Sequence, residues 1–310
     1  MATPVILDCD PGHDDAFAIW LAAGDPGIDL RAVTTVGGNG RLAHTTYNAR
    51  VVCSVAGVTS VPVAAGADRP LRRTLTTAES IHGANALGGP ELPEPTVAAD
   101  PRDAAVLIRD TLDAATEQVT IVATGPLTNI ALFVRIYPDR LSKIQRIVWL
   151  GGSTGRGNVT PYAEFNAWVD PEAVAVVLGC GVPFTMIGLN VTHQALVTPQ
   201  VLGRIEAIGN RTAAFGVELL HFYNSTYETD QGMPDGPLHD PIAVALVARP
   251  ELVTTVRTRL DVELLGTETA GATSVDLIDK LGRPANADVA TGLDVDGFWD
   301  LLEAALRELR

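Results

Sequence analysis

The feature that most constrains the fold of this chain is an alternation of short β-branched runs with amphipathic segments. Strands that alternate with helices need crossover connections, which are right-handed and place helices on both faces of a parallel sheet. The sequence therefore predicts an α/β fold, one domain over residues 1–310 with a mostly parallel central sheet flanked by helices. The pairs are VILD at 5–8 with a helix through Ala22, LRAVTTV at 30–36 with a helix over Leu42 to Ala56, VTIVAT at 119–124 with a helix from Leu127, RIVWLGG at 146–152 with a loop, and PFTMIGLNV at 183–191 with helices over about Pro199 to Tyr227.

Polar, glycine-rich sequence follows the predicted strands. The carboxyl ends of parallel strands meet at one edge of a sheet, and ligands bind at that edge. We therefore expect the functional site there, assembled from segments that are distant in the sequence. The segments that follow strands are DCDPGHDD at 8–15, GGN at 37–39, TGPLTN at 124–129 and GGSTGRGN at 151–158, and the later polar clusters AEFN at 163–166 and LHDP at 238–241 can join them.

Four carboxylates, Asp8, Asp10, Asp14 and Asp15, are crowded around the first strand end. Like charges repel and raise one another's pKa, so this cluster needs a cation, shared protons or helix-terminus donors. Asp14 and Asp15 alone could be anions in a first helical turn, which stabilise a helix by up to about 1 kcal/mol. A hard divalent cation, Ca²⁺ or Mg²⁺, also accounts for Asp8 and Asp10, whereas zinc would require histidine or cysteine ligands.

Charge and cysteine content narrow the partners and the compartment. The chain has 22 basic and 37 acidic residues and a formal net charge of −15, so its field repels nucleic acids and anionic membranes. A small neutral or cationic ligand fits better. Cys9, Cys53 and Cys180 show no CxxC or zinc-ligand spacing, and no signal-peptide pattern is visible at the N-terminus, so we expect the reducing cytoplasm.

Some features have a purely structural reading. The uncharged segment at 173–189 is long enough to suggest a membrane span, but Gly179, Gly181 and Pro183 divide it into a short helix and a short strand of the core. His239 and Asp240, before Pro241, could be only a helix cap. The four tryptophans, Trp20, Trp149, Trp168 and Trp299, are expected to pack in the core rather than to stack on bases.

Taken in order, these motifs resemble the inosine-uridine nucleoside hydrolase family over essentially the whole chain. The combination of DxDxxxDD with AEFN and HDP is the most specific part of the resemblance. The matching segments are DCDPGHDDAFAI at 8–19, VGGN at 36–39, IHG at 81–83, TGPLTNIAL at 124–132, AEFN at 163–166, VDPEA at 169–173, THQA at 192–195 and PLHDP at 237–241.

The resemblance implies an enzyme that hydrolyses the N-glycosidic bond of ribonucleosides to ribose and free base, with a tightly bound Ca²⁺. The implied Ca²⁺ ligands are the carboxylates of Asp10, Asp15 and Asp240 and the backbone carbonyl of Thr124. The implied ribose-binding residues are Asp14 and Asn166, which with Asp240 bind the 2′- and 3′-hydroxyls, Asn158 and Glu164 on the 5′ side, and Asn39, which with Asp8 supports the metal and Asp10.

The resemblance also assigns the chemistry. Asp10 would take the proton of a calcium-bound water that attacks C1′, and His239 would assist departure of the base. Positive charge develops on the sugar in such reactions, and the nearby carboxylates would stabilise it. The implied base contacts are His82, Tyr223, Tyr227 and Gln231.

The sequence is most similar to histidine-containing, pyrimidine-preferring members, with a broad inosine-uridine preference as the alternative. None of the four tryptophans lies in the IHG or PLHDP segments, where purine-specific members place them, whereas His13 and His82 match pyrimidine-preferring members. Leu150 replaces a methionine of the family and Asn190 an aspartate, and we expect both to tune rather than abolish activity. The resemblance further implies a homodimer or homotetramer.

Two other functions remain open from the sequence. LDCDPG, a strand followed by DxD, is also compatible with a Mg²⁺-dependent phosphatase of the haloacid dehalogenase type, which would need phosphate-binding lysines. Lys143 and Lys280 are not placed to serve. The second alternative is a protein that binds a nucleoside or sugar without turnover, against which the presence of both Asp10 and His239 argues.

Overall fold

The computed structural model describes residues 2–310 and is built on a nine-stranded sheet with the order β4-β3-β2-β1-β5-β6-β7-β11-β8. All neighbouring strands are parallel except β8, which is antiparallel to β11. The mostly parallel α/β prediction is confirmed. The strands are β1 (Thr3–Cys9), β2 (Ile28–Thr35), β3 (Val63–Ala65), β4 (Ala99–Asp100), β5 (Val119–Ala123), β6 (Ile144–Leu150), β7 (Phe184–Ile187), β8 (Val253–Thr258) and β11 (Ala287–Leu293), and β9 (Leu260–Val262) pairs separately with β10 (Thr273–Val275).

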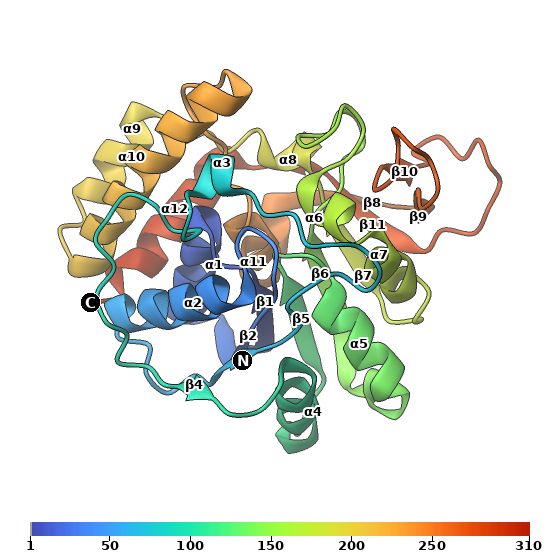
Figure 1. Ribbon diagram of the computed structural model, residues 1–310, viewed down its shortest axis with the longest axis horizontal. Coiled ribbons are helices and arrows are strands. Elements are labelled where there is room, and N and C mark those ends of the chain that lie inside the picture. Colours follow the sequence, from blue (N-terminus) through green and yellow to red (C-terminus); the bar gives the residue numbers. More distant parts are fainter. Residues whose placement is uncertain (1) are drawn as a thin grey trace.

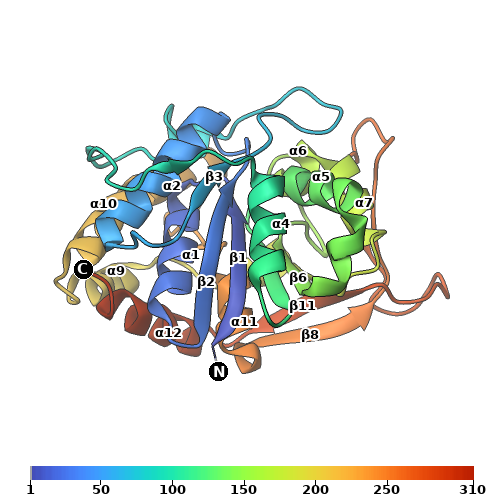
Figure 2. The ribbon, with the colours of Figure 1, turned by 90° about the horizontal axis from the view of Figure 1, so that it is seen from below.

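Helices cover both faces of the sheet, as Figures 1 and 2 show. One face carries α1, α2 and α10 to α12, and the other carries α4, α5 and α7. The helices are α1 (His13–Gly24), α2 (Leu42–Ala56), α3 (Glu79–His82), α4 (Ala104–Ala114), α5 (Thr128–Ile136), α6 (Phe165–Val169), α7 (Pro171–Leu178), α8 (Leu189–Thr192), α9 (Pro199–Glu206), α10 (Arg211–Gln231), α11 (Pro241–Ala248) and α12 (Val295–Arg307).

The period-2 geometry of the strands divides the core into two layers. In β1, Val5 and Leu7 pack on the α1 side of the sheet, whereas Ile6 packs on the α4 side. In β5, Val122 and Ile121 divide in the same way. Successive strand side chains point to opposite faces, so a central strand covered on both sides is apolar throughout. This explains why the strands appear in the sequence as continuous apolar runs.

The structure corrects one predicted boundary. The run at 183–191 is a strand only to Ile187, and the segment that follows is the short helix α8. The helices expected over about Pro199 to Tyr227 are α9 and α10, and α10 extends to Gln231. Between them the chain turns at Gly209, whose φ of +75° suits glycine, and restarts at the N-cap Asn210.

Other structural expectations are confirmed. The segment at 173–189 forms part of α7 and β7, and no helix of residues 2–310 is long and apolar enough to cross a membrane. Trp20, Trp149 and Trp299 are buried. All three cysteines are free thiols.

The sheet order places a topological switch point between β1 and β5. From β1 the chain adds β2, β3 and β4 on one side, and then crosses to the other side to form β5 and β6. The connections leaving β1 and β5 therefore diverge to opposite faces, which opens a crevice at the carboxyl ends of these two strands. The segments 10–15 and 124–127 emerge at this crevice.

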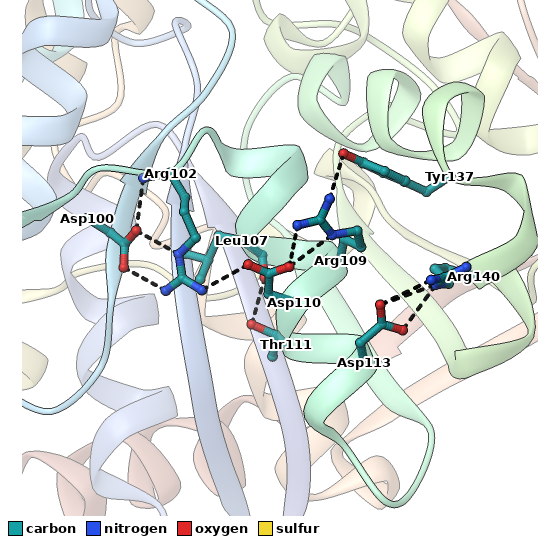
Figure 3. Close-up of polar contacts among 9 residues, drawn as sticks. All are labelled: Asp100, Arg102, Leu107, Arg109, Asp110, Thr111, Asp113, Tyr137 and Arg140. Carbon is teal, nitrogen blue, oxygen red and sulfur yellow. Dashed lines mark hydrogen bonds and ion pairs between the residues drawn. The ribbon is translucent and has the colours of Figure 1, made fainter.

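Away from this edge, α4 carries a surface network of ion pairs (Figure 3). Arg102 pairs with Asp100 at 2.7 Å and with Asp110 at 3.2 Å, and Arg140 pairs with Asp113 at 3.0 Å. These side chains are at least partly accessible to solvent, which screens their attraction, so the network contributes little to stability.

Asp170 provides a buried contrast to this network, and we predict that Asp170→Ala lowers the free energy of unfolding by roughly 2–3 kcal/mol. Its carboxylate caps α7 through the Ala173 amide at 3.0 Å and accepts hydrogen bonds from the Leu71 amide and the Thr128 hydroxyl, at 2.9 and 2.6 Å. The alanine variant leaves these donors without partners. Urea unfolding followed by circular dichroism measures the loss. Asp113→Asn is the exposed control, and equal shifts of the two unfolding midpoints would contradict the prediction.

Candidate active site

A cavity of about 280 Å³ opens at the carboxyl edge of the sheet, near the lower end of the roughly 300–1,000 Å³ typical of small-molecule sites. Its wall includes every predicted site residue except Asp10 and Asp15, which are fully buried behind it. The predicted residues in the wall are Asp14, Asn39, His82, Thr124, Asn158, Glu164, Asn166, Tyr223, Tyr227, Gln231, His239 and Asp240.

Asp15 holds the base of the cavity together. It lies in the first turn of α1 and accepts hydrogen bonds from the Gly12 amide at 3.0 Å and from Asn39 Nδ2 at 3.2 Å. Its other oxygen accepts a hydrogen bond from the Thr124 hydroxyl at 2.7 Å and from the Asp10 amide at 3.3 Å. One carboxylate therefore joins the ends of β1 and β5 and the loop after β2.

Asp10 has one satisfied and one free carboxylate oxygen. Oδ2 accepts a hydrogen bond from the Asn39 amide at 2.6 Å, whereas Oδ1 is buried and has no partner among the described residues. Two glycines fit closely around this carboxylate. A Cβ at Gly38 would lie 2.0 Å from Oδ2, and one at Gly125 would lie 2.4 Å from Oδ1. Both positions therefore need glycine for steric reasons.

Three carboxylates, those of Asp14, Asp15 and Asp240, each place an oxygen within 4.8 Å of the others. Asp10 adjoins this group, because its backbone amide donates a hydrogen bond to the Asp15 carboxylate. Burial raises the pKa of Asp10 and Asp240, and repulsion from neighbouring carboxylates raises it further. A cation at this position would reverse the effect by stabilising the charged forms.

These residues fit a hard divalent cation. Besides Asp10 Oδ1, Asp14 Oδ1 is buried without a partner, so two oxygens are free to act as ligands. The Thr124 carbonyl accepts one hydrogen bond, from Asn166 Nδ2 at 2.8 Å, and retains a second lone pair. A set made only of oxygen ligands suits Ca²⁺ or Mg²⁺ rather than zinc.

Asp8 lies below this group and outside the cavity wall. Its Oδ1 accepts hydrogen bonds from the Thr34 hydroxyl at 2.5 Å and from Asn129 Nδ2 at 2.7 Å, and burial raises its pKa to about 7. Thr34 and Asn129 were not predicted as site residues. Asn129 is part of the TGPLTN segment, but only the pairing of β5 beside β1 shows that it reaches Asp8.

Glu164 organises the neighbouring wall. It caps α6 by accepting hydrogen bonds from the Asn166 and Ala167 amides, at 2.8 and 3.0 Å, and it also accepts one from the Gly152 amide at 2.8 Å. Burial raises its pKa to about 7. Asn158 joins the same wall, because its Oδ1 accepts a hydrogen bond from the Phe165 amide at 3.0 Å.

The cavity is also lined by neutral, ring-bearing side chains. His239 Nδ1 is 2.6 Å from the Thr192 hydroxyl, and Nε2 is 2.8 Å from the Tyr227 hydroxyl. Burial lowers the pKa of His239 to about 3, so the imidazole is neutral at pH 7. Tyr223 packs against Tyr227 and donates its hydroxyl to the Pro237 carbonyl at 3.0 Å. Gln231, at the end of α10, donates to the Asn158 carbonyl at 3.4 Å.

Sequence reasoning missed several residues of the cavity. Trp168, expected in the core, is half-buried and lines the wall, as do Thr76, Thr77 and Leu189. These residues lie in loops and short helices without a chemical motif, so the sequence carried no signal for them. Of the two departures from the family pattern, Leu150 lines the cavity, and Asn190 does not but donates to the Ala290 carbonyl at 2.9 Å.

Comparison with known proteins agrees with this geometry. The family described as inosine-uridine preferring nucleoside hydrolase matches residues 5–300. The chain is 44% identical over 308 residues, 99% of each protein, to the pyrimidine-specific ribonucleoside hydrolase RihA of Escherichia coli O7:K1 (strain IAI39 / ExPEC). It is similar to the solved structures of a purine-preferring ribonucleoside hydrolase from Gardnerella vaginalis, with a TM-score of 0.91, 32% identity and 98% of each chain covered, and of the plant nucleoside hydrolase PpNRh1, with a TM-score of 0.92, 31% identity and 99% of each chain covered.

The chain therefore belongs to the inosine-uridine preferring nucleoside hydrolase family and is an enzyme. Membership confirms the resemblance found in the sequence. It removes the phosphatase and the non-catalytic binding protein as alternatives.

The carboxylate group predicts a Ca²⁺-dependent thermal stability. Removing divalent cations with a chelator should lower the melting temperature, and excess Ca²⁺ should restore it, because a ligand at 100 times its Kd stabilises a protein by about 2.7 kcal/mol. Asp15→Asn should abolish the Ca²⁺-dependent rise, whereas the surface variant Asp113→Asn should retain it. Differential scanning fluorimetry measures both effects. An equal rise in the two variants would place the cation elsewhere.

Proposed function

We propose that this enzyme uses bound Ca²⁺ to hydrolyse the N-glycosidic bond of pyrimidine ribonucleosides to ribose and free base. The observation that carries the proposal is the polarity of one cavity. The cavity is lined both by the acidic groups Asp14 and Asp240 and by neutral His239, which is hydrogen-bonded to Tyr227. A nucleoside has the same division, with a polyhydroxylated sugar at one end and a flat base at the other.

The residues proposed to hold Ca²⁺ are Asp10, Asp15, Asp240 and the Thr124 carbonyl. When bound, Ca²⁺ would balance the buried carboxylates, make an adjacent water more acidic and bind the vicinal hydroxyls of the ribose. The complete burial of Asp10 and Asp15 and the raised pKa values of Asp10 and Asp240 support this assignment.

Asp10 is the proposed general base. Its Oδ2 is fixed by the Asn39 amide, so the unpartnered Oδ1 is the oxygen available to take a proton. Water adds its oxygen to C1′ and gives that proton to Asp10 while the bond from C1′ to the base nitrogen breaks. Positive charge develops on the sugar in this step, and the neighbouring carboxylates stabilise it.

The proposed sugar contacts use groups with free hydrogen-bonding capacity. Asp14 Oδ1 has no protein partner and can accept a hydrogen bond from a ribose hydroxyl. Glu164 accepts hydrogen bonds from three backbone amides, which fix its position in the cavity wall. There, together with Asn158, it can bind the 5′ side of the sugar. Asn39 and Asn166 hold the carboxylate group and the Thr124 carbonyl in place.

His239 and Tyr227 form the proposed proton path to the leaving base. The base departs with the electron pair of the broken bond and leaves more readily when it receives a proton. His239 is neutral, and each of its ring nitrogens is hydrogen-bonded to a hydroxyl group. The Thr192 hydroxyl fixes the ring, and the Tyr227 hydroxyl connects it to the cavity. The 44% identity to a protein named pyrimidine-specific supports a pyrimidine as this base.

The first test is release of reducing sugar from uridine, cytidine, inosine and adenosine without phosphate. We expect ribose from the pyrimidine nucleosides at the highest rate, and loss of activity with a calcium chelator. Ribose formed without phosphate identifies hydrolysis rather than phosphorolysis. Faster cleavage of inosine than of uridine would contradict the pyrimidine preference, and no ribose from any substrate with Ca²⁺ bound would overturn the proposal.

A second test concerns the role of Asp10 as the general base. Asp10→Asn keeps an oxygen near the Asn39 amide but removes the proton acceptor, so kcat should fall by at least about 100-fold, the lower range for general base catalysis. Asp113→Asn is the matched control and should retain full activity. Steady-state kinetics with uridine measures both variants, and a kcat within a few-fold of the unsubstituted enzyme would exclude Asp10 as the base.

A third test concerns the 2′-hydroxyl. If this hydroxyl contacts the carboxylates and Ca²⁺, deoxyuridine should be a poor substrate. The N-glycosidic bond of deoxyuridine is no stronger than that of uridine, so the bond itself would not explain the difference. Parallel measurement of kcat/KM for uridine and deoxyuridine checks this, and equal values would show that the 2′-hydroxyl makes no such contact.

A further inference from the structure

Two buried histidines from different segments meet beside the cavity. His13 begins α1 and His82 ends α3, and their Nδ1 atoms are 3.0 Å apart. The Nε2 atom of His13 lies 2.9 Å from the Gly88 carbonyl oxygen. The two ring planes are inclined by 21° with centroids 5.2 Å apart, so the rings meet at their Nδ1 edges, and Phe222 stacks on His13 with centroids 5.3 Å apart.

The partners of this pair determine where the protons lie. A carbonyl oxygen only accepts hydrogen bonds, so His13 Nε2 must carry a proton to contact Gly88. A neutral His13 then has a lone pair at Nδ1, and the proton shared between the two Nδ1 atoms must belong to His82. Both rings are buried, and burial disfavours a charged imidazole, which supports a neutral pair.

This arrangement leaves the Nε2 atom of His82 with a lone pair. The Nδ1 edge of the ring is packed against Gly12, where a Cβ would lie 2.6 Å from Nδ1, and the ring stacks on Tyr223. His82 lines the cavity, and its Nε2 has no hydrogen-bond partner in the described part of the chain. The atom that remains for a ligand is therefore a hydrogen-bond acceptor.

We infer that His13 is a positioning residue that fixes the tautomer of His82, so that His82 Nε2 accepts a hydrogen bond from an N–H group of the substrate base. This inference rests on the proposed function. It selects bases that present an N–H donor, such as the amino group of cytosine or the N3–H of uracil. It also makes His82 an acceptor toward the base rather than a second proton donor beside His239.

The alternative arrangement places the proton of His82 on Nε2 instead of Nδ1. The backbone amide of His13 lies 3.3 Å from His82 Nδ1 and would donate to it if that atom were unprotonated. His13 would then be a buried cation with protons on both ring nitrogens, and His82 would present an N–H group to the cavity. The contact between the two ring nitrogens exists in both arrangements, and the burial of both rings favours the neutral pair, because a buried cation would lose its hydration.

Multiple-bond ¹H–¹⁵N correlation spectra of the Ca²⁺-loaded enzyme, without substrate, test the tautomer. The signals of His82 are assigned by their loss in His82→Gln. We expect a protonated Nδ1 and an unprotonated Nε2. A protonated Nε2 with an unprotonated Nδ1 would overturn the inference.

Two substitutions at His13 separate positioning from packing. Gln can donate to the Gly88 carbonyl and accept from His82 through its amide, so His13→Gln should keep the His82 tautomer. His13→Phe keeps the stacked ring but removes the acceptor. The backbone amide of residue 13 then becomes the remaining partner of His82 Nδ1, and the tautomer should change to Nε2–H. An unchanged tautomer in His13→Phe would show that His13 does not set it.

The kinetic consequence is a change in discrimination between bases. Cytidine and the riboside of 2-pyrimidinone differ by the 4-amino group, and a hydrogen bond to this group should favour cytidine in kcat/KM by about 10-fold. The ratio should persist in His13→Gln and fall to near 1 in His13→Phe. Comparing the ratio between variants cancels the different reactivities of the two substrates. An equal ratio in all three enzymes would show that His82 does not accept from this group.

The failure of this inference can be distinguished from failure of the proposed function. If no nucleoside is cleaved, the spectra of the enzyme without substrate still determine the His82 tautomer. If nucleosides are cleaved and His82 carries its proton on Nε2, the proposed function stands and the assignment of His13 is wrong.

Discussion

The structure depends on the burial of several carboxylates at the end of one strand. Asp10, Asp14, Asp15 and Asp240 are almost completely inaccessible to solvent, and their mutual repulsion adds to the cost of burial. Backbone amides, the Thr124 hydroxyl and the Asn39 amide groups satisfy many of their oxygens. The oxygens that remain free are the ones that a hard cation and a sugar can use. The energetic cost of this arrangement is thus linked to ligand binding.

The cavity is lined by two kinds of side chain, acidic carboxylates and neutral histidines and tyrosines. Carboxylates line the part proposed for the sugar, where a glycosidic transition state is positive. The histidines and tyrosines that line the cavity are buried and neutral, and their hydrogen bonds join neutral groups rather than ions. The acidic and the neutral lining residues would thus orient a substrate.

The positions of these groups follow from the sheet order. The switch point between β1 and β5 brings Asp10 and Thr124 together, and α11, which packs against α1, places Asp240 beside Asp14. The chain is similar both to a protein named pyrimidine-specific and to a structure named purine-preferring. Under the proposed function, base preference would depend on residues that line the cavity, such as Tyr223 and Tyr227 of α10 and His82 of α3.

The sequence by itself determined the α/β class and predicted most of the residues that the structure brings together at the cavity. Strand runs, helical periodicity and polar segments at strand ends are local properties, and motifs such as DCDPGHDD and PLHDP carry chemistry that few other folds need. Tertiary structure alone decided which carboxylate oxygens lack a hydrogen-bond partner. The donors come from distant segments, such as Asn129 for Asp8 and Asn39 for Asp10. It also brought His13 to His82 and Thr192 to His239, and placed Trp168 in the cavity wall. These contacts join segments tens of residues apart, and their geometry follows from packing that no local pattern encodes.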